Sequence, residues 1–179
     1  IAGDYAEAST GTFSEVVNSA TAKVVASAPI SGQEDVDKAF AAADAAFAEW
    51  GRTTPRQRQE ALLKFAAAIE ARSDEFVQLE GENTGKPNAL TASEEMPPML
   101  DQLRFFAGAA RVLEGRSTGE YMPGHTSWIR REPIGVIGQV TPWTVRAESI
   151  QAIPPNSAAG ALRVSARTRR YAADPARAM

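Results

Sequence analysis

Residues 128–143 constrain the fold more than any other part of this 179-residue chain. A basic pair and Pro133 precede residues 134–140, which are mostly apolar with two glycines, and a tight turn follows that ends at Trp143. A short apolar run between a proline and a turn is typical of a strand buried on both faces. Such strands occur in parallel sheets covered by helices, so the segment predicts an α/β fold with a buried strand over residues 134–140.

The first of four predicted helices follows a capping signal. Ser31 stands three residues before Glu34, the spacing of a capping box, and Gly51 is expected to end the helix. Apolar residues then recur at steps of three and four, which places them on one helical face. These residues are Val36, Phe40, Ala43, Phe47 and Trp50.

Three further helices are predicted from start and stop signals. Thr54 with Pro55 opens the second, Ser73 caps the third, which stops near Thr84-Gly85, and Pro97-Pro98 open the fourth, which Gly115 closes. Each contains an apolar stripe at helical spacing. The stripes are Leu62, Phe65, Ala66 and Ile69; Phe76, Val77 and Leu79; and Leu100, Leu103, Phe106, Ala110 and Leu113.

Two strand pairs are predicted outside the helices. Residues 13–29 contain two short β-branched runs with turn-forming Asn18-Ser19 between them, which indicates a hairpin. Residues 119–133 alternate loosely around Gly124 and predict a second short pair with a turn.

Charge divides the chain near residue 143. Residues 1–143 contain 13 basic and 20 acidic side chains, whereas residues 144–179 contain six arginines, two acidic side chains, ten alanines and no lysine. We therefore expect a boundary there, and a tail over residues 144–179 that is largely disordered. There is no apolar run of about 18 residues or more, so no membrane span is expected and a cytoplasmic location is the simplest hypothesis.

Five motifs resemble the NAD(P)-dependent aldehyde dehydrogenases, in family order. They are residues 18–25 (NSATAKVV), Trp50, residues 82–87 (ENTGKP), residues 103–111 (LRFFAGAAR) and residues 128–143 (WIRREPIGVIGQVTPW). The resemblance covers about residues 12–143 and is nearest to the branch that acts on amino-aldehydes such as γ-aminobutyraldehyde or betaine aldehyde. It implies that residues 1–143 form the N-terminal part of the family's domain, a partial Rossmann-like NAD-binding fold.

The resemblance also assigns roles. Val140, Thr141, Pro142 and Trp143 would line the nicotinamide side of NAD or NADP, and residues 120–133 would form an oligomerisation arm, which implies a homo-oligomer. In the family, a cysteine thiolate attacks a small-molecule aldehyde, hydride passes to the cofactor, and a glutamate-activated water releases the carboxylic acid. An asparagine amide and a backbone N–H hold the oxyanion.

The chain departs from that pattern at the catalytic residues. It contains no cysteine, Thr144 stands where the family has the oxyanion asparagine, and no motif for the general-base glutamate follows Trp143. We therefore expect a truncated family member with no catalytic residues, inactive by itself. The start at Ile1, without methionine, favours a processed or partial product. A shifted reading frame near codon 144 is our hypothesis for the tail, with a natural basic tail as the rival.

Other interpretations remain open. The chain could be a non-catalytic module that associates with full-length subunits through its arm. The arginines of the tail could bind nucleic acid, but the acidic balance of residues 1–143 argues against it. Arg130-Arg131 could contact a phosphate, although an exposed strand edge or a subunit contact is the better interpretation. The acidic residues Asp35, Asp37 and Asp44 are expected to be solvated rather than to bind a metal.

Overall fold

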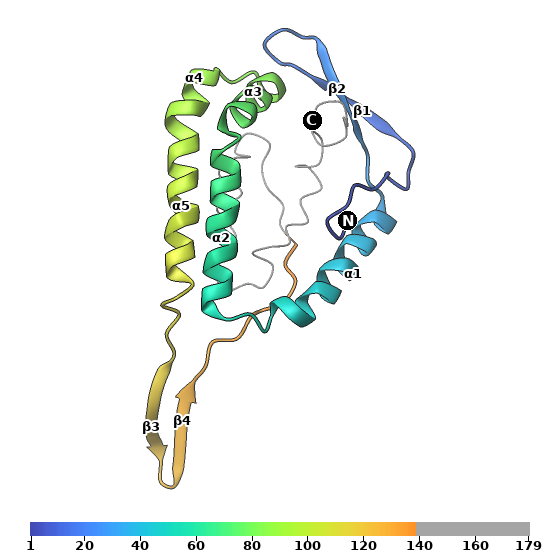
Figure 1. Cartoon of the computed structure of the whole chain (residues 1–179). Helices are drawn as coiled ribbons and strands as arrows, with labels where there is room; N and C mark the ends of the chain where they lie inside the picture. Colours follow the sequence, from blue (N-terminus) through green and yellow to red (C-terminus); the bar gives the residue numbers. More distant parts are fainter. Residues whose placement is uncertain (139–179) are drawn as a thin grey trace.

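The computed structural model describes residues 1–138, and its helices and strands form two hairpins around a helical group (Figure 1). The predicted α/β class is therefore observed. In chain order the elements are β1 (Phe13–Val17), β2 (Val24–Pro29), α1 (Gln33–Trp50), α2 (Pro55–Glu70), α3 (Ser73–Thr84), α4 (Asn88–Leu90), the π-helix η1 (Thr91–Glu95), α5 (Met96–Ala109), β3 (Arg116–Met122) and β4 (His125–Ile129).

The core lies where α2 and α5 pack side by side (Figure 1). Helix α3 and the start of the α5 region complete it at one end of the pair. The buried cluster is apolar and contains part of the stripe of the second, third and fourth predicted helices. Its members are Ala66, Ile69, Val77, Met96, Met99, Leu100 and Leu103. The predicted core residues Phe65, Phe76 and Leu113 are instead exposed, and Met96 and Met99 were not predicted.

Helix α2 begins as its sequence predicts. The Thr54 hydroxyl accepts the Gln57 N–H at 3.3 Å, and the Gln57 side chain accepts the Thr54 N–H at 2.8 Å. This reciprocal pair is a capping box, and Pro55 occupies the first turn, where no hydrogen bond of its own is lost. The predicted start of the second helix is confirmed.

The predicted start of the first helix is wrong by one residue. Helix α1 begins at Gln33 with Gly32 as its N-cap, and the Asp35 carboxylate accepts the Gly32 N–H at 2.9 Å. Glu34 instead pairs with Lys38 at 2.6 Å on the surface. The register shifts because the same Asp35 carboxylate also accepts the backbone N–H and the hydroxyl of Ser9, a long-range contact that local spacing does not reveal.

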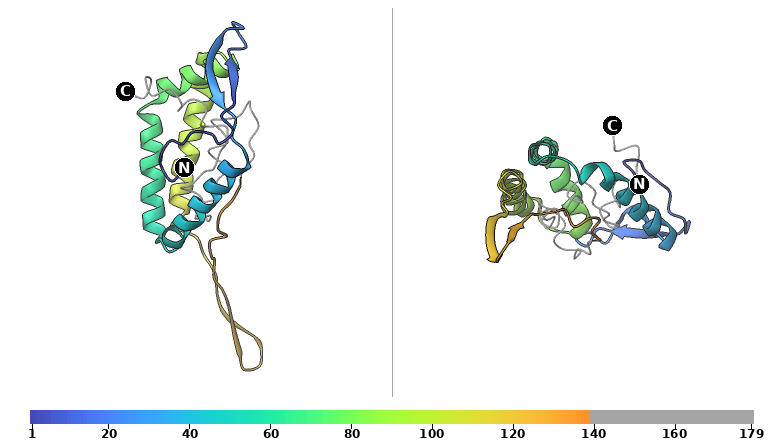
Figure 2. Two further views of the ribbon diagram at one scale, coloured as in Figure 1. Left: turned by 90° about the vertical axis from the view of Figure 1, so that its right-hand side faces the viewer. Right: turned by 90° about the horizontal axis from the view of Figure 1, so that it is seen from below.

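The apolar face predicted for α1 is only partly buried. Of the predicted residues only Ala43 is buried, Phe40 is 40% exposed, and the other buried apolar residue of α1 is Ala39. Figure 1 shows α1 set apart from α2 and α5, and the end-on view of Figure 2 agrees. An amphipathic helix that contacts so little keeps its large side chains partly in solvent.

Helix α3 starts and ends where predicted, but Ser73 is its first residue rather than its cap. The Ser73 hydroxyl donates to the Glu70 carbonyl at 2.8 Å. At the other end Gly85 has φ +76°, and its N–H donates to the Gly81 carbonyl at 2.9 Å, which closes the helix. The Ser19 hydroxyl donates to the Thr84 carbonyl at 2.6 Å and ties the β1–β2 turn to this helix end.

The fourth predicted helix is longer at one end and shorter at the other. Helix α4 and the π-helix η1 precede α5, which ends at Ala109 instead of near Gly115. The π-helix has a local cause. Pro97 and Pro98 lack an N–H, and their rings would clash with carbonyls four residues earlier, inside residues 91–95.

Both predicted strand pairs are present as antiparallel hairpins. Strand β1 pairs with β2 from Phe13 opposite Pro29 to Val17 opposite Val24. Strand β3 pairs with β4 in an irregular register that runs from Arg116 opposite Ile129 to Met122 opposite His125.

The parallel strand predicted over residues 134–140 is not formed in the part that is described. Residues 134–138 belong to no strand, and Ile134 is 79% exposed. A parallel strand exists only beside partner strands, and the two sheets within residues 1–138 are antiparallel two-stranded hairpins that do not include residues 134–138. The prediction is therefore wrong for residues 134–138, and residues 139–140 lie outside the described chain.

Candidate functional site

The predicted cofactor-lining residues lie outside the described residues. Val140, Thr141, Pro142 and Trp143 all follow Gly138, the last residue that the structure describes, and so do Thr144 and the arginine tail. The described elements that lead to these residues are the β3–β4 hairpin, the segment 130–138 and the helices beside that segment.

The segment that leads to the cofactor residues passes α1. Gly138 lies against Phe40, because a Cβ atom at position 138 would stand 3.2 Å from Cζ of that ring. A side chain there would push the ring or the segment aside, so glycine permits the close approach. Gly138 therefore has a packing role, whereas a Cβ atom at Gly135 would meet no other atom within 4 Å.

The β3–β4 hairpin projects away from the helices as an arm (Figures 1 and 2). At its tip the Gly124 N–H donates to the Glu120 carboxylate at 2.8 Å, and Gly124 has φ +76°. Trp128 is 61% exposed, and Met122 and Ile129 are exposed as well. An arm with several exposed large apolar side chains is suited to a contact with another protein chain.

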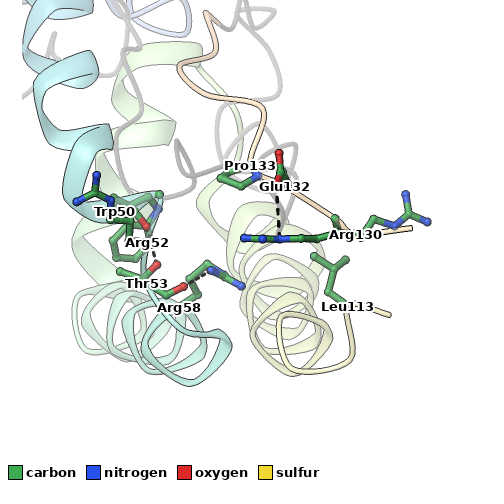
Figure 3. Close-up of a pocket in the computed structure, with 10 residues that line it drawn as sticks. Trp50, Arg52, Thr53, Arg58, Leu113, Arg130, Glu132 and Pro133 are labelled. Atoms are coloured by element: carbon green, nitrogen blue, oxygen red, sulfur yellow. Dashed lines mark hydrogen bonds and ion pairs between the residues drawn. The ribbon is translucent and has the colours of Figure 1, made fainter. Parts of the chain in front are cut away.

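A pocket of about 360 Å³ lies at the base of this arm. The end of α1, the loop to α2 and the start of α2 form one wall, and the segment after β4 forms the other (Figure 3). Arginines from both walls line it. The lining residues are Trp50, Gly51, Arg52, Thr53, Arg58, Leu113, Arg130, Arg131, Glu132 and Pro133.

Hydrogen bonds fix part of this lining. Arg58 donates from its guanidinium to the Thr53 carbonyl at 2.5 Å, and the Arg130 guanidinium lies 3.5 Å from the Glu132 carboxylate. Arg131 donates from Nε to the Glu114 carbonyl at 3.4 Å. Arg130 and Arg131, predicted to lie on an exposed edge, are exposed and also face a pocket that the sequence did not reveal.

Asp35 is the acidic residue whose environment differs most from the prediction. Its side chain is buried at 9% exposure rather than solvated, and it binds three donors from Gly32 and Ser9. The backbone N–H groups of Gly32 and Ser9 lower the pKa of the Asp35 carboxyl, because they stabilise its charged form. Asp35 therefore anchors the N-terminal segment to α1.

Within residues 1–138, no group of three His, Asp or Glu side chains is placed to hold a metal ion.

The sequence and the fold both match known enzymes. The family model described as "Aldehyde dehydrogenase family" matches residues 5–165, which is more than half of the chain. This chain belongs to the aldehyde dehydrogenase family. The match reaches past residue 143, where the motifs alone had ended, and the boundary that we placed there stays a prediction.

Curated relatives support the assignment. Aldehyde dehydrogenase 1 of Tanacetum cinerariifolium is 36% identical over 149 residues, which is 82% of this chain and 30% of the relative. Acetaldehyde dehydrogenase 2 of Cupriavidus necator is 36% identical over 143 residues, 80% of this chain and 28% of the relative. The chain therefore spans about 30% of the length of these aldehyde dehydrogenases.

Solved structures show the same fold. The crystal structure of PnpE from Pseudomonas sp. WBC-3 aligns with a TM-score of 0.79 at 32% identity, over 84% of this chain and 31% of PnpE. A betaine aldehyde dehydrogenase from Staphylococcus aureus, solved with NAD⁺, gives the same TM-score at 26% identity, over 84% and 30% of the two chains. The predicted fold, a partial N-terminal part of an aldehyde dehydrogenase α/β domain, is confirmed.

The relatives do not single out the amino-aldehyde branch. Their names include acetaldehyde, benzaldehyde, malonate-semialdehyde and betaine aldehyde dehydrogenases.

Within residues 1–138, none of the helices has the length and apolar character that crossing a membrane requires.

Proposed function

We propose that this chain is the N-terminal part of an NAD(P)-dependent aldehyde dehydrogenase that oxidises an amino-aldehyde to a carboxylic acid. The observation that supports it most is the joint match of sequence and fold over most of the chain. Relatives solved with nicotinamide adenine dinucleotide support the cofactor. Bound NAD⁺ or NADP⁺ would accept the hydride, and Val140, Thr141, Pro142 and Trp143 are the residues proposed to line it.

We further propose that the chain is catalytically inactive by itself. It contains no cysteine, so the thiolate that family chemistry needs cannot form. Thr144 replaces an amide by a shorter hydroxyl, and loss of one oxyanion donor lowers the rate by about 10²–10³-fold. The missing nucleophile has the larger effect, because no covalent intermediate can form without it.

A fusion protein tests the proposed role of residues 1–143. These residues would replace the matching part of acetaldehyde dehydrogenase 2 of Cupriavidus necator, and aldehyde-dependent reduction of NAD⁺ would be measured. We expect an active fusion whose activity falls when Trp143 is changed to Ala. A fusion that assembles like the parent enzyme on gel filtration but shows no activity would contradict the proposal. The substrate class is tested by comparing kcat/KM for betaine aldehyde with kcat/KM for acetaldehyde in the intact enzyme. The proposal predicts the higher value for betaine aldehyde.

A second function is supported by the exposed arm. The chain could associate with full-length subunits through the β3–β4 hairpin, where Trp128 and Ile129 are exposed. Burying the exposed part of one tryptophan, about 120 Å², contributes about 3 kcal/mol at about 25 cal/mol per Å². Trp128 is therefore able to contribute strongly to a contact with a partner, and Ile129 faces the opposite side of the strand.

Co-purification with a tagged full-length aldehyde dehydrogenase tests this association. We expect capture of the unsubstituted chain, strongly reduced capture after Trp128→Ser, and unchanged capture after Thr126→Ser, an exposed polar position on the same strand. Equal capture of both variants would show that the arm does not mediate the contact.

A further inference from the structure

We propose that the pocket at the base of the arm is a binding site for a small anion that carries phosphate or carboxylate groups. The proposal concerns residues 50–58 and 113–133 and does not depend on the oxidoreductase assignment. The pocket is defined by the ten residues given above, which come from three separate parts of the chain.

The charge of the lining favours an anion. Four arginines, Arg52, Arg58, Arg130 and Arg131, line the pocket together with one acidic residue, Glu132. The side chains of Arg58 and Arg130 extend into the space between the two walls (Figure 3). Guanidinium groups bind phosphate and carboxylate with paired, charge-assisted hydrogen bonds. A single acidic side chain leaves an excess of positive charge, and like charges held together are stabilised by an anion between them.

The wall formed by α1 and α2 has no carboxylate of its own among the lining residues. The first turn of α2, which starts beside Thr53, contains no acidic residue, so the positive end of that helix is not compensated locally.

The site is partly organised before any ligand binds. The bond from Arg58 to the Thr53 carbonyl fixes one guanidinium on the α2 wall, and the bond from Arg131 to the Glu114 carbonyl restrains another on the opposite wall. Less side-chain entropy is then lost when a ligand binds. A pocket of about 360 Å³ is within the usual range for small ligands and accommodates a pyrophosphate or a short dicarboxylate.

Fluorescence of Trp50 provides a local measurement. Replacing Trp128 and Trp143 by Phe in the full chain leaves Trp50 as the only tryptophan. Sodium pyrophosphate and sodium succinate would be titrated separately, with sodium chloride at equal ionic strength as the reference. We expect a saturable change in Trp50 fluorescence with at least one of the two anions. A response to pyrophosphate but not to succinate identifies a phosphate site, and the reverse identifies a carboxylate site.

Charge-removing variants decide whether the pocket is responsible. We expect Arg58→Gln and Arg130→Gln to weaken binding by about tenfold or more, as for loss of a hydrogen bond to a charged group. Arg56→Gln removes the same charge from α2 outside the pocket, where Arg56 pairs with Glu60 at 2.7 Å, and should leave binding unchanged. A response that does not saturate, that chloride reproduces, or that Arg56→Gln weakens equally would overturn the proposal. Isothermal titration of the unsubstituted chain with the same anions checks the result without fluorescence.

Discussion

Substitution of Met99 by Ala should destabilise the described fold strongly. Met99 is 1% exposed, on α5, within the cluster that α2, α3 and α5 share. The change removes three heavy atoms from the side chain, which at about 0.8 kcal/mol each lowers the free energy of unfolding by about 2.4 kcal/mol. The cavity that remains adds to this, so we expect a total loss of about 2–5 kcal/mol.

Urea denaturation followed by the helical circular dichroism signal measures this loss. Met122→Ala is the matched control, because Met122 is 56% exposed on the arm and the same change there should alter the free energy of unfolding by less than about 0.5 kcal/mol. Should Met99→Ala fail to fold, Met99→Leu keeps the volume and should lose less than about 1.5 kcal/mol. The reasoning is refuted if Met99→Ala and Met122→Ala differ by less than about 1 kcal/mol.

Three further predictions concern local contacts. The lowered pKa of Asp35 means that its contribution to stability is present above the unfolded pKa, about 3.9, and is lost as the pH falls through the lower folded value. Urea midpoints of the unsubstituted chain and Asp35→Asn should therefore converge below about pH 4, and a constant difference would argue against the assignment. Gly85→Ala should lower the thermal midpoint, because φ is +76° and the new Cβ would stand 2.5 Å from Ser19 Oγ. Gly108→Ala, inside α5 with open space around it, should raise that midpoint, and the opposite order would contradict the account. Thr54→Ala removes the cap of α2 and should lower the free energy of unfolding by about 1 kcal/mol in urea, which Thr54→Ser should restore.

Local signals predicted most helices and both hairpins. The capping box at Thr54, the left-handed glycine at position 85 and the turn at Gly124 each act within a few residues, so the sequence reveals them directly. The apolar spacing of α2 and α5 likewise predicted four members of the buried cluster, Ala66, Ile69, Leu100 and Leu103, but not Met96 or Met99. Phe65, predicted on the same face of α2, is 44% exposed.

Features that depend on distant residues were missed. The start of α1 is set by Asp35 bonding to Ser9, 26 residues earlier. The predicted parallel strand needs partner strands that residues 1–138 do not provide. The basic pocket is formed by residues about 80 positions apart, and no rule of local spacing predicts such a contact.

The π-helix was missed for another reason. Its signal, Pro97-Pro98, is local, but we interpreted it only as a helix start.

An assay of aldehyde oxidation by the purified chain tests the central claim, that this family member lacks the chemistry of the intact enzyme. NADH or NADPH formation would be followed with betaine aldehyde, γ-aminobutyraldehyde and acetaldehyde, before and after treatment with iodoacetamide. The chain has no cysteine, so iodoacetamide abolishes only the activity of contaminating thiol enzymes. We predict no aldehyde-dependent signal after treatment. Activity that survives iodoacetamide and scales with the concentration of the chain would contradict the account.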